Sequence, residues 1–290
     1  MERTALVTGC SSGIGRATAE AFSEEDWTVY ATARDEGDLA GLDTETASLD
    51  VTDDGDIERV VDQIVEETGR IDCLVNNVGK TASPSSPAHQ KSSISEDAGY
   101  GQYGPLEDVP SEQLTAQLDV NVVGPHRLVR AVLPHMRATG EGTIINVSSV
   151  AGRVAPPGAG AYAASKFALE GYSDTLRNEV SGLGIDVALV EPGPVETPFR
   201  SRAERELDTL ARTDDYEWVY EMQEDAGLLS GSESPFASTP EEVAATILEA
   251  GVSTNPKARY AVGSFAKMLL FGRFLPDGLR DRVITLFRKL

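Results

Sequence analysis

Tyr162 and Lys166 stand four residues apart in the segment Tyr-Ala-Ala-Ser-Lys, which has the character of the start of a helix. Residues i and i+4 lie on one face of a helix, so the phenol and the ammonium could share a site. A phenol with its ordinary pKa of about 10 is a poor base at neutral pH, and a nearby cation would lower that pKa. The pair would then exchange a proton with an alcohol or carbonyl oxygen. The alternative is an amphipathic helix with an incidental tyrosine, since this spacing alone is common.

Two further polar positions could complete such a site. Ser148 and Ser149 follow a predicted strand at 142–147, at the edge of the sheet where ligands bind. A hydroxyl there can donate a hydrogen bond to a substrate carbonyl oxygen, although serine pairs also serve as turns or caps. Asn121 lies in an apolar helical stretch, where a buried amide must find partners. It would hold a water or a backbone group near Lys166, or it is a structural residue that kinks the helix.

A glycine-rich loop near the start of the chain has the pattern of a phosphate-binding turn. It follows a predicted strand at 4–8 and opens a predicted helix at 13–23. In such a loop the glycines permit a tight turn, a close approach of the backbone to a pyrophosphate, and close packing of helix on sheet. The helix N-terminus presents free N–H groups to the phosphates, whereas a plain glycine turn would bind nothing. The residues expected to contact the cofactor here are Gly9, Ser11, Ser12, Gly13, Ile14 and Gly15.

The residue after the second predicted strand, at 28–33, selects between the two nicotinamide cofactors. An acidic residue there binds the ribose 2′-hydroxyl of NAD(H), and an arginine accommodates the 2′-phosphate of NADP(H). Counting from Gly15 places Ala33 and Arg34 at this point, one step before Asp35. We predict that NADP(H) is preferred and that NAD(H) is possible, since Arg34 could also be an ordinary solvated arginine.

Strand-like and helix-like segments alternate along the chain, which indicates βαβ units and a parallel sheet with helices on both faces. The prediction is an α/β fold: a single doubly wound (Rossmann) domain over 1–290 with a mostly parallel sheet of about seven strands, and a C-terminal lid and helical extension. A long helix is predicted over 111–135 and another over 161–181. The predicted strands are 4–8, 28–33, 47–51, 72–76, 142–147, 185–190 and 258–262.

Three segments depart from this alternation. Residues 80–99 are rich in Ser, Pro and Ala and read as a surface loop, and residues 200–240 are acidic with aromatic residues interspersed and are predicted to form a substrate lid. Residues 257–290 carry 8 basic and 2 acidic side chains with amphipathic helical faces; we favour docking on the chain's own acidic body or a subunit contact over contact with a membrane. The lid's apolar side chains would line a pocket for a bulky hydrophobic substrate or simply pack the lid onto the body; they are Phe199, Leu207, Leu210, Tyr216, Trp218, Tyr220 and Met222.

Seven sequence elements together resemble the short-chain dehydrogenase/reductase family, in the family's order and across about the first 200 residues. Within the family, the sequence most resembles the branch of the 17-beta-hydroxysteroid and retinol dehydrogenases. The segments that carry this resemblance are TGCSSGIG, YAASKFALEG and VEPGPVET. The seven elements are TGCSSGIG (8–15), DVTD (50–53), NNVG (76–79), Asn121, the serine before the active-site loop, YAASK (162–166) and PGPVET (192–197).

The resemblance implies roles for individual residues. Ser149, which stands 13 residues before Tyr162, would polarise the substrate oxygen, and Tyr162 would be the general acid and base. Lys166 would lower the pKa of Tyr162 and bind the nicotinamide ribose, and Asn121 would anchor a water for proton relay. The other implied cofactor contacts are Asp50 and Val51 at the adenine, Asn77 and Gly79 along the cofactor channel, and Pro192, Val195 and Thr197 at the nicotinamide carboxamide.

The sequence also departs from the family pattern. Val78 stands where the family has a small residue. Residues 80–99 separate NNVG (76–79) from YGQYGPLE (100–107), which look like the two halves of a run that this branch often keeps together. The insertion would emerge near the substrate mouth. We favour a passive or salt-adaptive insert over a lid, because the segment offers few apolar anchors.

Composition limits the possible partners. The 290 residues include 47 acidic and 25 basic side chains, for a net charge of -22, which argues against nucleic acid as the main partner. A surface rich in Asp and Glu with only 6 lysines is typical of a salt-adapted microbe, although an ordinary acidic protein is the alternative. Cys10 and Cys73 do not resemble a secreted disulfide framework, and the N-terminus does not resemble a signal peptide. We expect a cytoplasmic homo-oligomer with a small-molecule substrate and no metal site.

The sequence therefore predicts an oxidoreductase that transfers a hydride between a nicotinamide and a carbonyl or secondary alcohol carbon, on a bulky hydrophobic substrate. The alternative is a non-enzymatic redox sensor that binds NADP(H) and regulates a partner. An epimerase or dehydratase on the same fold is a third reading, although such enzymes usually have longer chains. The identity of the substrate is not readable, because one fold serves many pockets.

Overall fold

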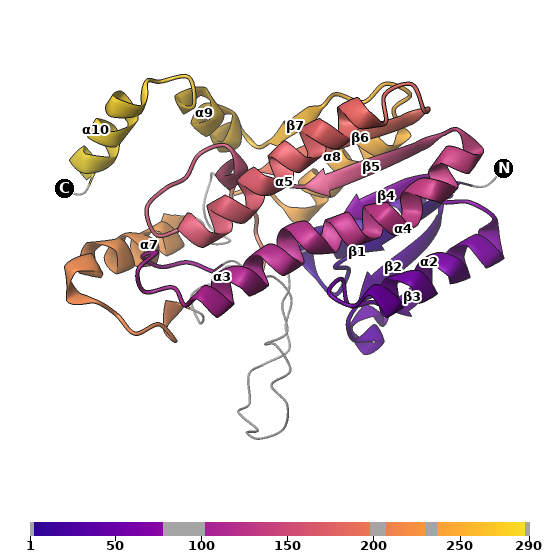
Figure 1. Ribbon diagram of the computed structural model, residues 1–290, viewed down its shortest axis with the longest axis horizontal. Coiled ribbons are helices and arrows are strands. Elements are labelled where there is room, and N and C mark those ends of the chain that lie inside the picture. Colours follow the sequence, from indigo (N-terminus) through magenta and orange to yellow (C-terminus); the bar gives the residue numbers. More distant parts are fainter. Residues whose placement is uncertain (1–2, 78–101, 198–206, 230–236, 288–290) are drawn as a thin grey trace.

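Seven parallel strands form one sheet at the centre of the molecule (Figure 1). The computed structural model describes residues 3–77, 102–197, 207–229 and 237–287. The strand order is β3-β2-β1-β4-β5-β6-β7, and every neighbouring pair is parallel, which confirms the predicted doubly wound fold. The strands are β1 (Thr4–Thr8), β2 (Thr28–Ala33), β3 (Glu45–Ser48), β4 (Cys73–Asn76), β5 (Gly142–Val147), β6 (Ile185–Pro192) and β7 (Arg259–Val262).

Helices cover both faces of the sheet, because its central strands are apolar on both sides. Along β1, Leu6 belongs to one hydrophobic core and Val7 to the other, as the alternation of side chains in a strand requires. The helices that pack on the first core are α2 (Asp54–Thr68), α4 (Gly124–Thr139) and α5 (Gly160–Glu179), and those on the second are α1 (Gly13–Glu24) and α8 (Pro240–Val252).

The strand order reverses between β1 and β4. From β1 the chain builds outward to β2 and β3, and from β4 it builds in the other direction to β7. In sheets of this kind ligands bind in the crevice outside the carboxyl ends of the strands, at the point of reversal. The topology brings the glycine loop after β1, Asn77 after β4, Ser149 after β5 and Pro192 at the end of β6 to this one edge.

Two predicted elements differ from the observed ones. The predicted strand at 47–51 is displaced, since β3 ends at Ser48, and Leu49 and Val51 stay in the core beyond the last residue paired with β2. The predicted helix over 111–135 is interrupted: α3 (Ser111–Leu118) leads into a π-helical turn, η2 (Asp119–Val123), and then into α4.

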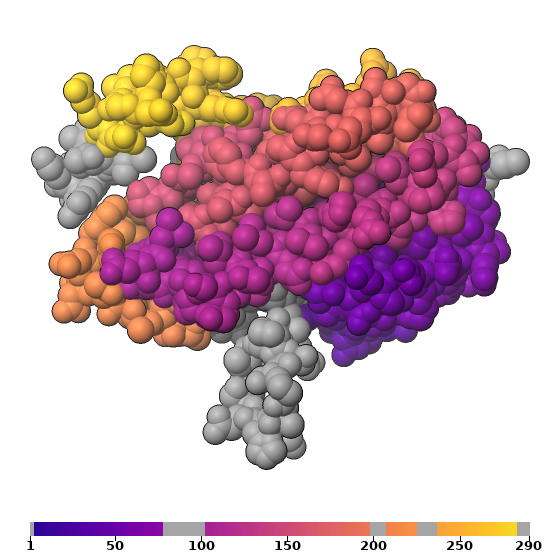
Figure 2. Space-filling model, in the orientation of Figure 1, coloured from indigo at the N-terminus to yellow at the C-terminus, as the bar shows by residue number. Residues whose placement is uncertain are grey.

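The C-terminal third adds helices outside the sheet. A short 3-10 turn, η4 (Asp214–Tyr216), leads into α7 (Glu217–Leu229), and β7 is followed by α9 (Ser264–Gly272) and α10 (Asp277–Phe287). In the space-filling view these last two helices, in yellow, stand out from the body (Figure 2). No helix in the described ranges is long and apolar enough to cross a bilayer. The insertion at 80–99 and the parts 200–206 and 230–236 of the predicted lid lie outside the described residues.

Candidate active site

The glycine loop is too tight to admit a side chain at Gly9 or at Gly15. Gly9 has a φ of +71°, and a Cβ at Gly15 would lie 2.2 Å from the Gly9 carbonyl oxygen. Asn77 braces the loop from β4, because its Nδ2 donates to the carbonyl oxygens of Thr8 (3.2 Å) and Gly9 (3.3 Å). In the described part of the chain the Ser12 hydroxyl makes no capping hydrogen bond, so the first amides of α1 are available to an anion. These features fit the phosphates of a dinucleotide.

The predicted adenine side of the cofactor site lies beyond the ends of β2 and β3. Arg34 follows β2 directly and is partly buried, and its carbonyl oxygen accepts a hydrogen bond from Ser48 Oγ (2.7 Å). Asp35 acts locally, since its Oδ1 accepts from the Gly37 amide (2.9 Å) and caps the short helix η1 (Glu36–Leu39). The other two predicted contacts, Asp50 and Val51, lie in the turn between β3 and α2.

The predicted nicotinamide side is built by the segment after β6. Val195 forms an isolated bridge with Ser238, which ties the segment to the start of α8. Thr197 lies over the glycine loop, because a Cβ at Gly13 would lie 2.9 Å from the Thr197 methyl group. The structure therefore brings together the segments that the sequence assigned to the cofactor, with the exception of Gly79, which lies outside the described residues.

Asn121 is positioned by the π-helical turn. It is buried, and its Nδ2 donates to Ser165 Oγ (3.0 Å), which in turn donates to the carbonyl oxygen of Tyr162 (2.7 Å). The amide therefore braces the helix that carries Tyr162 and Lys166. Its Oδ1 is buried and has no hydrogen-bond partner among the described residues. A buried acceptor of this kind is costly unless a water or ligand donates to it, and π-turns of this kind are frequent at functional sites.

Ser149 and Tyr162 meet at the carboxyl end of β5. The two side chains share a hydrogen bond, and Ser149 Oγ also accepts from the Ala151 amide (3.1 Å) at the start of η3 (Val150–Gly152). Ser149 therefore caps η3 and also lies beside the phenol, where the prediction places a site residue. Burial raises the pKa of Tyr162 to about 12, and the hydrogen bond from Ser149 only partly opposes it.

Lys166 lies beneath the phenol and is buried. Its Nζ donates to the carbonyl oxygen of Val147 (2.9 Å) and stands 5.8 Å from the centre of the Tyr162 ring. Burial lowers the pKa of Lys166 to about 8, with the charge of Glu170 acting in the opposite direction. Burial therefore dominates the pKa of both groups and outweighs the lowering of the Tyr162 pKa that was expected from Lys166.

A charge network that the sequence analysis did not identify lies below Lys166. Glu170 of α5 and Glu191 of β6 are both buried, and each pairs with two arginines. Arg153, in the segment after Ser149, approaches Glu191 at 3.0 Å and Glu170 at 3.6 Å. Arg259 of β7 approaches Glu170 at 3.0 Å and Glu191 at 3.3 Å. The network joins the three segments that carry Ser149, Lys166 and Pro192. It could not be predicted from the sequence, because its four charged residues lie far apart in the chain.

Replacing Glu170 by glutamine is expected to move the alkaline loss of turnover to lower pH. The ammonium of Lys166 loses its proton as pH rises through about 8, and Glu170 favours the protonated form. Removing that charge lowers the Lys166 pKa further. The measurement is the pH profile of kcat/KM for wild type and variant. The control is Glu179→Gln, an exposed carboxylate on the same helix, which should leave the profile in place; an equal shift in both variants would contradict the coupling.

The described part of the predicted lid packs against residues 102–109. Leu207, Leu210 and Tyr220 are buried in a small cluster with Tyr103, which favours the packing interpretation for these lid side chains. Asp108 fastens the contact, because its carboxylate accepts hydrogen bonds from Thr213 Oγ1 (2.6 Å) and the Tyr220 hydroxyl (2.6 Å).

Tyr103 belongs to the site, although the sequence analysis assigned it no role. Its ring stacks on that of Tyr162, with 5.7 Å between the centroids. The segment 102–109 thus reaches from the lid to the reactive phenol. In the sequence, the one feature that could have indicated a role for Tyr103 is its place in YGQYGPLE, the second half of the family run that the insertion separates.

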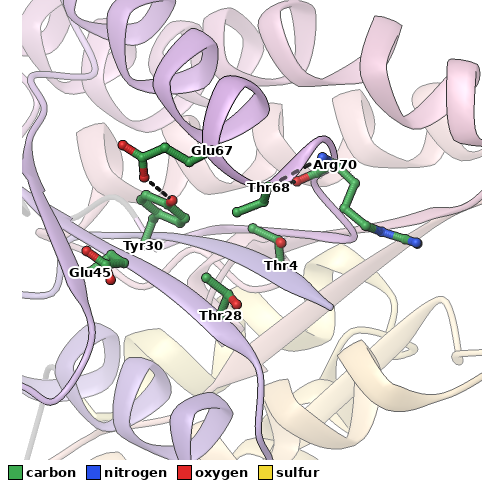
Figure 3. A pocket seen from close by; sticks show the side chains of 7 residues that line it. All are labelled: Thr4, Thr28, Tyr30, Glu45, Glu67, Thr68 and Arg70. Atoms are coloured by element: carbon green, nitrogen blue, oxygen red, sulfur yellow. Dashed lines mark hydrogen bonds between the residues drawn. The ribbon is translucent and has the colours of Figure 1, made fainter. Parts of the chain in front are cut away.

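A pocket of about 440 Å³ lies at the opposite, amino end of the strands (Figure 3). Tyr30 donates a hydrogen bond to Glu67 there. Arg70 forms ion pairs with Asp72 and Glu141. Glu67 and Arg70 are therefore engaged with neighbouring side chains, and the pocket is separate from the edge that carries Tyr162. The remaining lining residues are Thr4, Thr28, Glu45 and Thr68.

Comparison with known proteins identifies the family. The family model described as short chain dehydrogenase matches residues 3–208. The chain belongs to the short-chain dehydrogenase family. Among its relatives, a 3-ketodihydrosphingosine reductase of Bacteroides thetaiotaomicron is 33% identical over 97% of this chain and 96% of the relative. Human 17-beta-hydroxysteroid dehydrogenase type 1 is 34% identical over 90% of this chain and 77% of the relative. The resemblance inferred from the sequence is confirmed, and this short-chain dehydrogenase is an NAD(P)-dependent enzyme acting on CH–OH and C=O groups.

Solved structures of other short-chain dehydrogenases agree with the fold. One from Streptomyces avermitilis is 32% identical and covers 99% of this chain and 96% of its own, with a TM-score of 0.75. A metagenomic short-chain oxidoreductase in complex with NADP is 25% identical and covers 90% of this chain and 96% of its own, with a TM-score of 0.64.

Proposed function

We propose that this short-chain dehydrogenase prefers NADP(H) and interconverts a carbonyl and a secondary alcohol on a bulky hydrophobic substrate. The observation that carries the proposal is the meeting of Ser149, Tyr162 and Lys166 beside a glycine loop that fits a dinucleotide. When bound, the nicotinamide supplies or accepts the hydride.

The protein's own residues handle the proton and the substrate oxygen. Tyr162, which keeps its proton at neutral pH because burial raises its pKa to about 12, donates that proton to the oxygen during reduction. Ser149 donates a second hydrogen bond and stabilises the charge that develops there. Lys166, when charged, stabilises the phenolate that is left and holds the ribose. Asn121, with its unpaired buried Oδ1, anchors the water through which the phenol regains a proton.

The preference for NADP(H) rests on the end of β2. Arg34 follows the strand directly, and Asp35 is held in a local helix cap that uses its carboxylate. A guanidinium matches a 2′-phosphate in geometry and charge. The solved relative in complex with NADP supports the same preference.

The proposed substrate class rests on the surroundings of Tyr162. The ring of Tyr103 stacks on it, and an apolar cluster of lid residues packs behind that ring. The aromatic ring of Tyr103 beside the phenol suits a hydrophobic substrate, while the lid cluster behind it is buried against residues 102–109. Two relatives are named for a reaction on a sphingoid base and on a steroid, which are both bulky and apolar. The redox-sensor alternative has no support among these relatives.

A carbonyl panel tests the proposal. NADPH and NADH oxidation are followed in parallel with long-chain ketones, steroid ketones, sugars and short aldehydes, at low and at high salt. We expect turnover of the bulky apolar ketones, with NADPH favoured over NADH. Binding of NADPH without turnover of any carbonyl would instead favour the sensor.

Replacing Arg34 by alanine is expected to raise the KM for NADPH by at least tenfold, about 1.4 kcal/mol. The KM for NADH should stay nearly unchanged, because the guanidinium that is removed would bind the 2′-phosphate, which NADH lacks. Asp35→Ala is the matched control at the neighbouring residue. If Asp35→Ala weakened NADH binding while Arg34→Ala changed neither cofactor, the preference would be for NAD(H).

We further propose a homo-oligomer that works in the cytoplasm of a salt-adapted microbe, with all 290 residues in one domain. The excess of 47 acidic over 25 basic side chains supports the salt-adapted surface. Sedimentation velocity and activity across a salt series test the oligomer and the adaptation separately.

A further inference from the structure

Five large apolar side chains are exposed together on α9, α10 and the turn between them. Met268 is 62% exposed, Phe271 73% and Phe274 80%, and Leu275 (37%) and Leu279 (46%) continue the run. They are half of the ten large apolar side chains that the described residues leave exposed, within twelve consecutive positions. We call these five residues the tail surface. Contiguous apolar exposure of this kind marks an interaction site, unlike single exposed side chains.

The tail surface is one continuous feature. Successive i to i+3 backbone hydrogen bonds carry the helical path from α9 through residues 273–275, and the rings of Phe271 and Phe274 touch with 6.4 Å between their centroids. α9 leaves the end of the sheet with its start packed on the body, and α10 stands further out at one end of the molecule (Figure 1, Figure 2). These five side chains therefore do not pack on the chain's own body, although Ala266 at the start of α9 does.

Positive charge is in excess beside this apolar surface. Lys267, Arg273 and Arg282 are exposed there, against exposed Asp281, and Arg280 pairs with Asp277. Residues 257–290 hold 8 of the chain's 25 basic side chains and only 2 of its 47 acidic ones, which leaves 17 basic against 45 acidic elsewhere. An apolar surface edged with Lys and Arg complements an anionic lipid interface.

We propose that the tail surface docks this enzyme on the surface of an anionic lipid bilayer, without crossing it. A second copy of the chain is a poorer match. Pairing tail to tail would bring two basic surfaces together, and outside the tail the described residues expose large apolar side chains only at scattered positions. Those positions are Leu106, Val123, Phe167, Leu183 and Val252.

The docking surface adjoins the active site. α9 begins two residues after the carboxyl end of β7, and Ala266 of α9 packs against Gly193, next to the segment expected to hold the nicotinamide. The docking proposal rests on the exposed surface and goes beyond the proposed reaction. Because its test uses no substrate, the docking proposal and the proposed reaction can fail independently.

Vesicle flotation of the full chain tests the proposal. The probes are vesicles of phosphatidylcholine alone and of phosphatidylcholine mixed with phosphatidylglycerol. We expect the protein to float with the mixed vesicles and much less with the neutral ones. The double variant Phe271→Ser, Phe274→Ser should bind at least tenfold more weakly, whereas the matched pair Leu183→Ser, Val252→Ser, which is 43% and 40% exposed outside the tail, should change binding less than twofold. Arg273→Gln with Arg282→Gln should weaken binding to the anionic vesicles alone, and raised salt should mimic that loss.

Three results would overturn the proposal. One is wild-type protein that stays unbound with anionic vesicles. Another is equal binding by the Phe271→Ser, Phe274→Ser variant when circular dichroism shows that it is folded. The third is conversion of an oligomer to monomers by that variant in sedimentation velocity, which would assign the tail surface to a contact between copies.

Discussion

Tyr162→Phe is expected to abolish turnover and to leave NADPH binding intact. The substitution removes the hydroxyl that exchanges the proton and keeps the ring that stacks on Tyr103. Loss of a positioned general acid and base lowers turnover by about 100- to 10,000-fold. The measurements are steady-state oxidation of NADPH with the best ketone of the panel, and fluorescence titration with NADPH.

The matched control is Tyr172→Phe, on the same helix. It removes a phenol that contacts His126 Nδ1 (3.3 Å) far from the carboxyl edge of the sheet, and turnover should stay within a factor of about two, as for most surface changes. Full activity in Tyr162→Phe would rule out the proposed proton path. Loss of NADPH binding in that variant would show instead that the phenol shapes the cofactor site.

A second large effect is expected from Gly15→Ala in the glycine loop. The new Cβ would lie 2.2 Å from the Gly9 carbonyl oxygen and 2.6 Å from Asn77 Nδ2, so backbone must move. Overpacking of this kind costs about 1–3 kcal/mol of stability. Displacement of the loop by about 1 Å is expected to lower kcat/KM for NADPH by roughly 100-fold. Chemical denaturation and cofactor kinetics measure the two effects.

Gly171→Ala provides the control for this change. Gly171 lies inside α5, and a Cβ there would meet nothing within 4 Å. The same substitution should therefore stabilise the protein by about 0.5–1 kcal/mol, because alanine favours a helix interior. Equal behaviour of the two variants would show that the loop can relax around the added methyl group.

The fold was predictable because its signals are local. The apolar runs at 4–8, 28–33 and 142–147 are the observed strands without adjustment, and the glycine loop stands where it was placed. The position of β3 was predicted wrongly because Leu49 and Val51 are buried like strand residues but lie beyond the part of the chain that pairs with β2. Apolar sequence indicates burial and does not show which residues pair with a neighbouring strand. The π-turn at Asn121 was missed because apolar spacing does not distinguish a helix from one with a single inserted residue.

The candidate site was less predictable, because much of it depends on distant segments. Arg153, Glu170, Glu191 and Arg259 meet only in the folded chain. Spacing correctly placed Lys166 beneath Tyr162, but the direction of the phenol's pKa shift depends on burial that spacing does not reveal. Tyr103 reaches the site across the start of α5, from a segment that precedes α3.

The hydrogen bonds of Asp108 have a consequence for how the site responds to acid. Burial alone would raise the pKa of this carboxylate, but hydrogen bonds from Thr213 and Tyr220 outweigh that effect and lower it. These hydrogen bonds therefore persist at neutral pH and weaken only in acid. Because residues 102–109 carry both Asp108 and Tyr103, whose ring stacks on Tyr162, the hydrogen bonds that hold the described part of the lid also hold that ring at the phenol. Acid that protonates Asp108 is therefore expected to loosen the ring and the lid together.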